Sequence, residues 1–517
     1  MEKLKNKVQL ISYPDSLGGN LRGLHTVLTK YFNGAFGGVH ILPFYPSSSG
    51  RGFSILTHLE VDPVFGDWND ISEVAKNFDL VCDLSVNHIS SQSAQFKDFM
   101  EKGKESEFAD WFITNEKFSR RIRGKKRKGW GDFLPTVEKF VNFLRRHDRV
   151  LHRQGVNIWI LKKNHSPRAG SPFVEFPMGD GVTRGVWCTF SKDQIDLDVE
   201  NEGVRRMFEQ AIKGLAKKGT KMLRLGAVGY ASKKRGTDNF MTPQTYKFIQ
   251  WIAEVAHENG IIILPQVHHH HTTKIKLSKT EGVDRVYDFV LPMLMLRAVY
   301  SGNAKYLKNW IKIRPHNQIT VLDTHDGIGV VDVADLMPKG EIENTVNKLR
   351  EYGGNAAMRS TGMGKKDSNI YQQNITFYSA VGASDEKYLL SRAVQFFIPG
   401  IPQVYYVGLL AGENDEENFK QSGVGKDLMR HNYTFEEVEE NYKRDVVQRL
   451  YKLMKFRNSH EAFDGFFTLG NTNDKKLTLR WDKDEVFCEL RVDFEAPNAV
   501  IEYSDKKTGG VEFLEVC

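Results

Sequence analysis

Polar and ionisable side chains that could hold a small molecule or move a proton end four apolar, β-branched runs of the sequence. A single Asn-His pair in such a place is more often an anchor for a loop than a catalyst. Four sets at four strand ends would instead meet in one pocket if the strands lie in parallel around a barrel. We therefore predict a shared pocket. The four sets are Asp83 with Asn87 and His88, then Arg224, then Gln266 with His268, and Asp323 through Asp326.

Eight apolar runs of strand length supply the elements that must position these side chains. Amphipathic helical patterns lie between several of them, at residues 70–77, 202–217 and 243–258. Alternating strands and helices in this number favour an α/β fold with a parallel (β/α)8 TIM barrel. A doubly wound sheet competes, but no GxGxxG turn opens any of the helices. The strand candidates are residues 8–13, 38–44, 80–86, 222–228, 261–267, 286–291, 319–322 and 404–407.

Two regions interrupt the alternation. Residues 101–200 are too long for a loop between a strand and a helix, so we predict an inserted subdomain after the third strand. In residues 464–517 short strands alternate with Gly, Asn and Asp turns, which predicts a C-terminal antiparallel β domain. The barrel then comprises residues 1–100 and 201–463. The strands predicted in the C-terminal domain are residues 476–481, 485–494, 500–503 and 511–516.

Composition excludes several classes of protein. The 517 residues are 40% hydrophobic and include 33 Phe, 18 Tyr and 8 Trp, which excludes wholesale disorder. Four widely spaced cysteines exclude a disulfide scaffold and a CxxC zinc module. The sequence has no run of about 18 apolar residues to span a bilayer, and residues 1–7 lack the apolar stretch of a signal peptide. We expect a cytoplasmic protein without a membrane partner.

Positive charge is concentrated in one segment. The chain has 72 Lys and Arg against 65 Asp and Glu, a formal charge of +7, but residues 117–168 alone hold 16 Lys and Arg against three Asp and Glu. The rest of the chain is therefore mildly acidic. This basic run indicates a polyanion site, attraction of phosphate or a phosphorylated sugar, or only a solvated surface. No recognised nucleic-acid fold accompanies it.

Five further motifs carry a resemblance to a known family. From about residue 8 to the C-terminal domain, the sequence resembles the sucrose phosphorylase branch of the α-amylase clan, glycoside hydrolase family 13. The resemblance implies the barrel with its two additions. It also implies an activity in carbohydrate metabolism, in which a glucosyl unit passes from sucrose or a similar α-glucoside to a carboxylate and then, with retention, to phosphate. The motifs are QLISYPDSLGGNL at 9–21, GGVHILPF at 37–44, VLDTHDGIGV at 321–330, AVQFFIPG at 393–400 and PQVYYVG at 402–408.

The resemblance also implies roles for individual residues. Asp326 corresponds to the carboxylate that stabilises the oxocarbenium-like transition state, and this residue is retained. The family's reaction implies no metal and no cofactor. The residues that would bind the substrate are His88, Arg224, Tyr230, His325, Gln372 and Arg430.

Three positions depart from the family's pattern. The nucleophile motif Arg-x-Asp-Ala-Val-Gly-Tyr here contains Gly226, which has no side chain to attack the anomeric carbon. The acid/base glutamate is replaced by Gln266, whose amide cannot give up a proton near neutral pH. Ser54 replaces an aspartate that binds glucose. Losing one member of such a catalytic set commonly lowers turnover by about 10⁴ to 10⁶.

We therefore expect a catalytically impaired homologue that still binds an α-glucoside. Two alternatives stay open. One is an active glucosyl transferase or phosphorylase with a changed mechanism, in which phosphate enters the hole at Gly226 and attacks with inversion. The other is a regulatory or scaffold protein recruited through residues 117–168.

A run of four histidines at residues 268–271 offers a general-acid or a metal role. Adjacent residues on one segment point in different directions, however. Neither a Cys nor a carboxylate pattern completes a site around the run, so we expect no metal there.

Overall fold

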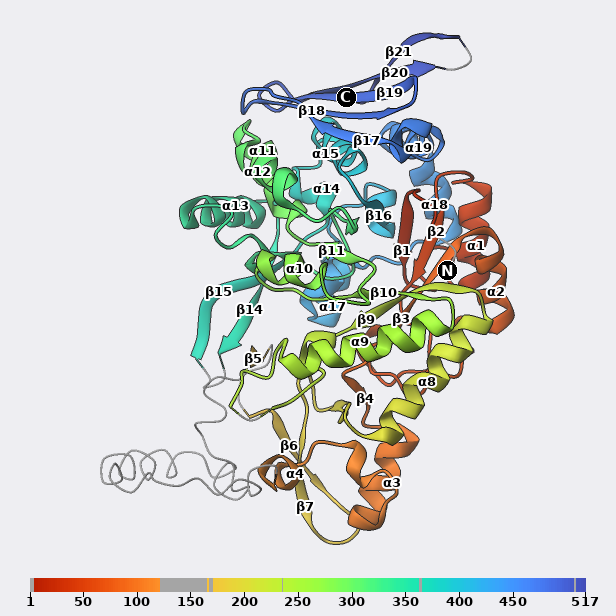
Figure 1. Ribbon diagram of the computed structural model, residues 1–517, viewed down its shortest axis with the longest axis vertical. Helices are drawn as coiled ribbons and strands as arrows, with labels where there is room; N and C mark the ends of the chain where they lie inside the picture. Colours follow the sequence, from red (N-terminus) through yellow and green to blue (C-terminus); the bar gives the residue numbers. More distant parts are fainter. Residues whose placement is uncertain (1–3, 121–164, 167–170, 235, 362–364, 506–507) are drawn as a thin grey trace, which may run out of the picture.

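Eight parallel strands form a nearly closed barrel in the computed structural model (Figure 1). The structure describes residues 4–120, 165–166, 171–234, 236–361, 365–505 and 508–517. Neighbouring strands are hydrogen-bonded in the order β10-β9-β3-β2-β1-β16-β12-β11, and the end strands β10 and β11 lie next to each other. Each strand overlaps a predicted apolar run, so the predicted TIM barrel is confirmed. The strands are β1 (Gln9–Ser12), β2 (Gly38–Ile41), β3 (Asp79–Ser85), β9 (Thr220–Gly226), β10 (Ile262–Pro265), β11 (Val286–Asp288), β12 (Gln318–Thr320) and β16 (Ile401–Tyr405).

The helices follow local sequence signals. α8 (Glu202–Lys217) begins after Asn201, whose side chain accepts hydrogen bonds from the first turn, and one face of the helix is apolar and buried. α9 (Pro243–Glu258) begins with a proline after the cap Thr242. Of the helices in the described residues, none is long and apolar enough to cross a membrane. The others outside the interval from β3 to β9 are α1 (Leu21–Lys30), α2 (Trp68–Asn77), α10 (His271–Leu277), α11 (Leu291–Ser301), α12 (Lys305–Ile313), α13 (Lys339–Glu351), α14 (Phe377–Ala380), α15 (Asp385–Phe397), α16 (Tyr406–Leu409), α17 (Glu416–Ser422), α18 (Phe435–Tyr442) and α19 (Asp445–Ser459).

The interval between β3 and β9 holds a group of small elements. β4 (His88–Ser90) pairs with β8 (Gln194–Asp196), and β6 (Phe173–Pro177) pairs with β7 (Thr183–Trp187), both in antiparallel fashion. The limits of the predicted subdomain stay a prediction, and most of the basic run lies outside the described residues. The remaining elements here are α3 (Ala94–Lys102), α4 (Asn115–Arg120) and β5 (His165–Ser166).

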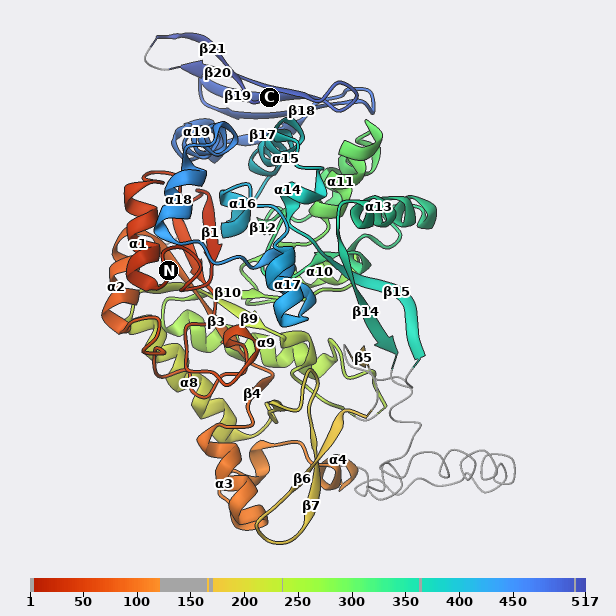
Figure 2. The same cartoon turned by 180° about the vertical axis from the view of Figure 1, so that it is seen from behind.

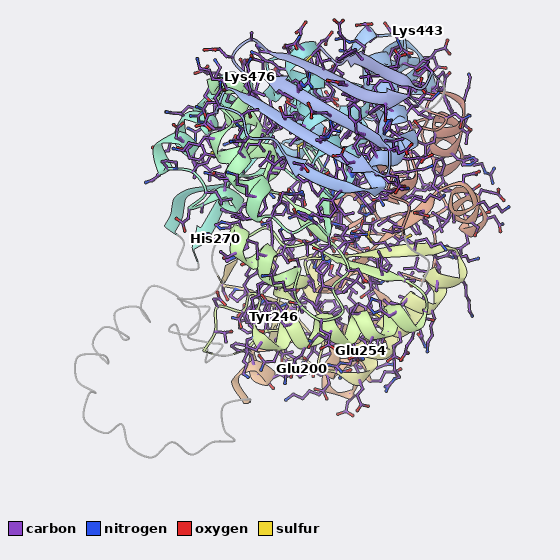
Figure 3. All side chains as sticks on the ribbon, turned by 45° about the horizontal axis from the view of Figure 1, so that its top comes forward. Glu200, Tyr246, Glu254, His270, Lys443 and Lys476 are labelled. Carbon is purple, nitrogen blue, oxygen red and sulfur yellow. The ribbon has the colours of Figure 1, made fainter. Side chains whose placement is uncertain are left out.

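A five-stranded antiparallel sheet follows the barrel and packs against α15 (Figure 1). Figure 3 shows this sheet from its outer side, with Lys476 at the start of β18. The Trp481 indole Nε1 donates to the Phe397 carbonyl at 2.7 Å and fixes the contact. The sequence predicts four of the strands but not β17, because none of its four residues is buried. The strands are β17 (Phe466–Leu469), β18 (Lys476–Lys483), β19 (Val486–Asp493), β20 (Asn498–Asp505) and β21 (Gly510–Glu515).

A four-stranded antiparallel sheet is not predicted by the sequence. β13 (Ile328–Gly329), β15 (Lys365–Asn374), β14 (Asn355–Thr361) and β5 are neighbours in that order, and β14 and β15 project from the barrel (Figure 2). Lys, Asp, Ser, Gln and Asn are frequent in β15, so a search for apolar runs passes over it. β15 matters for the site because it carries Gln372.

Candidate active site

A cavity of about 700 Å³ lies where several barrel strands end. β9 carries Arg224 and Gly226 into it, and the turns after β10 and β12 and strand β15 supply further side chains. Of the strand-end sets predicted to share a pocket, Asp83, Asn87, Asp323 and Thr324 do not line this cavity, whereas His268 does. Of the ten residues to which the resemblance gives a role, nine line it and come from across the barrel. They are His88, Arg224, Gly226, Tyr230, Gln266, His325, Asp326, Gln372 and Arg430.

Ser54 is the remaining predicted residue, and the structure does not place it in the cavity lining. It is fully buried in the loop after β2, where its Oγ lies 2.9 Å from the Oγ of Ser49. Arg51 and Phe53 from the same loop line the cavity instead. The Phe53 ring stacks on His325 with centroids 5.2 Å apart. The loop therefore supplies a guanidinium group and an aromatic ring rather than a hydroxyl.

A buried ion pair beneath the cavity fixes Arg224. Asp83 on β3 and Arg224 on β9 face each other across paired strands, and Asp83 Oδ1 pairs with Arg224 Nη1. The other oxygen of Asp83 lies 3.0 Å from His40 Nε2. Burial alone would raise the pKa of Asp83, but Arg224 and His40 lower it to about 2. Arg224 is therefore a charged group held in one orientation.

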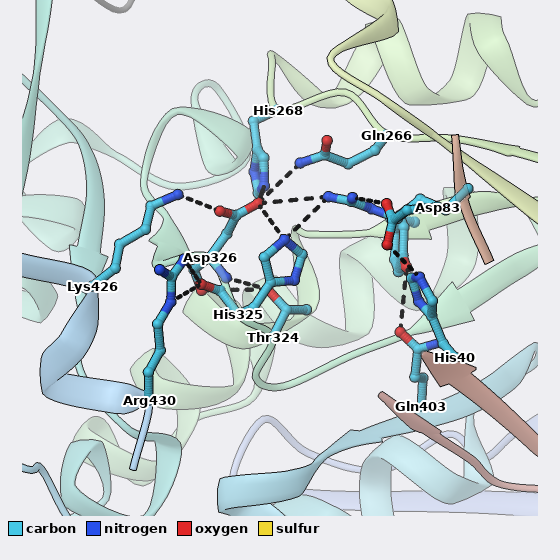
Figure 4. A network of polar contacts seen from close by, with 12 residues as sticks. His40, Asp83, Gln266, His268, Thr324, His325, Asp326, Gln403, Lys426 and Arg430 are labelled. Atoms are coloured by element: carbon cyan, nitrogen blue, oxygen red, sulfur yellow. Dashed lines mark hydrogen bonds and ion pairs between the residues drawn. The ribbon is translucent and has the colours of Figure 1, made fainter. Parts of the chain in front are cut away.

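Basic and amide side chains surround Asp326 (Figure 4). Lys426 pairs with Oδ1, and the Gln266 amide donates to Oδ2 at 3.1 Å. His325 Nε2 and Arg224 Nη2 lie 3.6 and 3.9 Å from Oδ2. Burial would raise the pKa of Asp326, but nearby positive charge, that of Lys426 first, holds it well below its ordinary value. Asp326 is therefore an anion at neutral pH and can stabilise positive charge that develops in the cavity.

Lys426→Met is expected to move the acid limb of ligand binding to higher pH. Lys426 is the main group that lowers the pKa of Asp326, so removing it raises that pKa. A sugar hydroxyl that donates to Asp326 needs the ionised carboxylate, so affinity in the variant is lost earlier as the pH falls. Calorimetric titration of a glucoside between about pH 4 and 7 measures the shift. Lys420→Met, which removes an exposed lysine paired with Glu416, is the control, and identical acid limbs in the two variants would contradict the expectation.

Gly226 lines the cavity and has room for a Cβ atom beside Arg224. A Cβ at this position would lie 3.6 Å from the Ser85 Oγ and 3.7 Å from the Arg224 Nη1, which are ordinary contact distances. The backbone of Gly226 is not in the left-handed region. Neither the chain path nor the surrounding atoms therefore require glycine here, and the end of β9 presents no nucleophilic side chain.

Aromatic rings form another wall of the cavity. Tyr230 packs against Phe190 and Phe240, with ring centroids 5.3 and 4.9 Å apart. Such rings bury the apolar faces of a ligand while nearby polar groups fix its orientation. Sequence reasoning found Tyr230 but missed Phe190, Phe240 and Lys426. Lys426 is 100 residues from Asp326 in the chain, and no local signal connects the two.

The four consecutive histidines turn to different partners. His268 faces the cavity, whereas His270 lies at the surface (Figure 3). Within the described residues no group of three or more His, Cys, Asp or Glu is arranged to hold a metal ion. The partners of the other three are Thr273 for His269 at 2.7 Å, Asp335 for His270 at 3.0 Å and the Ala334 carbonyl for His271 at 3.1 Å.

Comparison with known proteins places this chain in a family. The family described as alpha amylase, catalytic domain, matches residues 8–172. The glucosylglycerol phosphorylase of Marinobacter adhaerens is 40% identical over 514 residues, which cover 99% of both chains. The sucrose phosphorylase of Bifidobacterium adolescentis is 37% identical over 522 residues, covering 97% of this chain and 96% of that one. The crystal structure of sucrose 6F-phosphate phosphorylase from Thermoanaerobacter thermosaccharolyticum has a TM-score of 0.90 at 40% identity, covering 100% of this chain and 99% of that one. The chain therefore belongs to the sucrose phosphorylase branch of the α-amylase family, glycoside hydrolase family 13.

Proposed function

We propose that this chain binds an α-glucoside in the cavity and does not form the covalent glucosyl ester of the family's retaining reaction. Gly226 carries the proposal, because the position that the resemblance gives to the nucleophile has no side chain. Relatives named for sucrose, sucrose 6F-phosphate and glucosylglycerol support a glucosyl-containing ligand. The activity is thus impaired relative to the family's double displacement, while sugar binding is kept.

The geometry around Asp326 supports the same proposal. Its carboxylate is ionised and accepts a hydrogen bond from Gln266, so neither group offers a proton to a leaving oxygen. Arg224, His325 and Arg430 remain as charged or polar groups that can hold a sugar. The family's catalytic set consists of a nucleophile, an acid/base group and a carboxylate that stabilises positive charge. Of these three functions, the side chains named here supply the last.

Sucrose or a related α-glucoside is expected to bind without phosphate-dependent turnover that retains the anomeric configuration. Asp326→Asn should weaken binding about tenfold or more, because a hydrogen bond to a charged acceptor contributes about 1.5–3 kcal/mol. Calorimetry measures the binding, and product analysis by NMR measures turnover in the same preparation. Release of α-glucosyl phosphate by the unmodified chain would contradict the proposal.

A second candidate is transfer by a single displacement, and the part of the cavity left free by the missing side chain at Gly226 favours it. That space lies beside the Arg224 guanidinium, which suits an oxygen of phosphate placed beneath the anomeric carbon. Attack from there breaks the bond to the leaving oxygen and inverts the configuration, so the product is a β-glucosyl phosphate. Such a reaction needs no enzyme nucleophile.

Incubation with α-glucosyl fluoride and phosphate tests the second candidate, because fluoride leaves with little help from an acid. The expected product is β-glucosyl phosphate, detected by NMR above the buffer rate. Gly226→Leu, which fills the space with an apolar side chain, should abolish the product. Absence of any glucosyl phosphate from the unmodified chain would overturn this candidate and leave the binding function in place.

A regulatory or scaffold function through residues 117–168 stays a prediction, because this segment lies mainly outside the described residues. A chain that neither binds nor turns over a glucoside would favour this alternative. Binding of a polyanion by the unmodified chain would then be the next measurement.

A further inference from the structure

His268 follows β10 and projects into the cavity two residues after Gln266. Its side chain is almost fully buried, and its ring stacks on Phe289 with centroids 3.8 Å apart and planes 17° from parallel. Figure 4 shows the ring pointing at Asp326 from the same side as Gln266. A histidine is thus held rigidly next to the position that the resemblance gives to the acid/base group.

A buried carboxylate orients this imidazole. Asp332 Oδ2 lies 3.3 Å from His268 Nδ1, and Asp332 Oδ1 pairs with Lys274. Burial would raise the pKa of Asp332, but Lys274 and His268 lower it, so this carboxylate is ionised. An ionised carboxylate only accepts hydrogen bonds, so the nitrogen that faces it carries a proton. The second ring nitrogen, Nε2, is left to gain or lose a proton on the cavity side.

The Nε2 atom of His268 has the position and the freedom that proton transfer needs. It lies 3.9 Å from Asp326 Oδ2, the oxygen that the Gln266 amide binds at 3.1 Å. Among the described residues no hydrogen-bond partner takes up this nitrogen. The imidazole and the amide therefore converge on one point of the cavity, and of the two only the imidazole is an acid–base group.

The other carboxyl and imidazole groups that line the cavity, within the part of the chain that the structure describes, are less suited to this task. The pKa of Asp326 is far below its ordinary value, so it holds no proton to give. Burial lowers the pKa of both His88 and His325, so these rings are neutral. Asp427 lies 3.7 Å from Arg430 in an ion pair. His268 is the remaining imidazole, and it has a carboxylate behind it.

We propose that His268, oriented by Asp332, is the general acid and base of this cavity in place of Gln266. The proposal rests on the single displacement described above. An oxygen of phosphate forms a bond to the anomeric carbon while the bond to the leaving oxygen breaks. The electron pair of that bond stays on the leaving oxygen, which takes the proton from His268 Nε2. The products are a β-glucosyl phosphate, the alcohol and a neutral imidazole, which regains its proton from solvent.

Two glucosyl donors that differ in their need for an acid test this assignment. Both are measured in the Gly226→Asp variant, whose new carboxylate is a nucleophile, so the test does not depend on phosphate entering the cavity beside residue 226. Sucrose needs a proton on its leaving oxygen, and α-glucosyl fluoride does not. We expect His268→Gln to lower turnover of sucrose by about 10²- to 10⁴-fold and to change turnover of the fluoride by less than about threefold. His270→Gln, at the surface in the same run, should leave both rates unchanged.

A carboxyl group restored at position 266 tests whether His268 acts as an acid or only supports the structure of the cavity. Adding Gln266→Glu to the His268→Gln chain should return sucrose turnover, because a second acid then stands at the same point. Equal loss on both donors, no loss on either, or turnover of neither donor in the Gly226→Asp chain would each overturn the assignment. Sugar binding by the unmodified chain is measured separately by calorimetry, so the binding function survives or fails independently.

Discussion

The double variant Gly226→Asp with Gln266→Glu is expected to transfer glucose from sucrose to phosphate with retention, at a rate about 10⁴-fold or more above the unmodified chain. The first carbon of a side chain at position 226 meets only ordinary contacts, and Gly226 lines the cavity, so the new carboxylate can extend into it beside Arg224. At position 266 the Gln266 amide lies 3.1 Å from Asp326 Oδ2. A carboxyl group there would keep its proton, because a second negative charge so close to the first is unfavourable.

The product anomer decides this prediction. Retention gives α-glucosyl phosphate, which NMR distinguishes from the β-anomer of a single displacement. Gly226→Asp with Gln266 unchanged, measured on α-glucosyl fluoride, reports whether the nucleophile alone is in place. A double variant that binds sucrose but releases no α-glucosyl phosphate would mean that the cavity differs from an active site at more than these two positions.

Arg224→Leu is expected to destabilise the protein by about 3–5 kcal/mol, because it leaves Asp83 as a buried charge without its main partner. Asp83 is fully buried, and Arg224 and His40 are the groups that hold its pKa at about 2. Without Arg224 that pKa rises. The ionised carboxylate is then the unfavourable form, so the deficit in unfolding free energy is largest at neutral pH and shrinks as the pH falls and the carboxyl is protonated.

Denaturant unfolding of a matched pair checks this second prediction. Arg224→Leu combined with Asp83→Asn removes both charges, so the double variant should recover most of the lost stability. A double variant as unstable as Arg224→Leu would show that packing of the arginine stem, rather than the buried charge, dominates the loss.

Much of the fold can be predicted because burial dictates composition along the barrel. β3 is buried at all seven positions, and its apolar residues Leu80, Val81, Cys82 and Leu84 make it recognisable as a strand. α8 has its predicted bounds, since Asn201 caps its start and one apolar face is buried. Polar residues at strand ends meet because parallel strands of a barrel end at one face. The nine predicted residues in the cavity follow from that geometry and from the family's motifs.

The sequence does not predict the contacts that join side chains from distant loops. Lys426 reaches Asp326 across 100 residues, and Asp332 reaches His268 across 64. Neither pairing leaves a local pattern, because each side chain is an ordinary charged residue in its own segment. The orientation of Ser54 away from the cavity is equally a property of its loop. β15 is largely polar, so it can be recognised as a strand only once its partner strands are known.

The position of β1 in the barrel has a consequence for biosynthesis. β1 pairs with β2 on one side and with β16 on the other, where Gln9 is matched with Gln403. A ribosome adds about 5–20 residues per second, so roughly 20 to 80 s separate the emergence of the first strand from that of its second neighbour. During that interval one edge of β1 has unpaired backbone groups, which are prone to pair with other chains. We therefore expect association with other chains to be a greater hazard before β16 leaves the exit tunnel than after it.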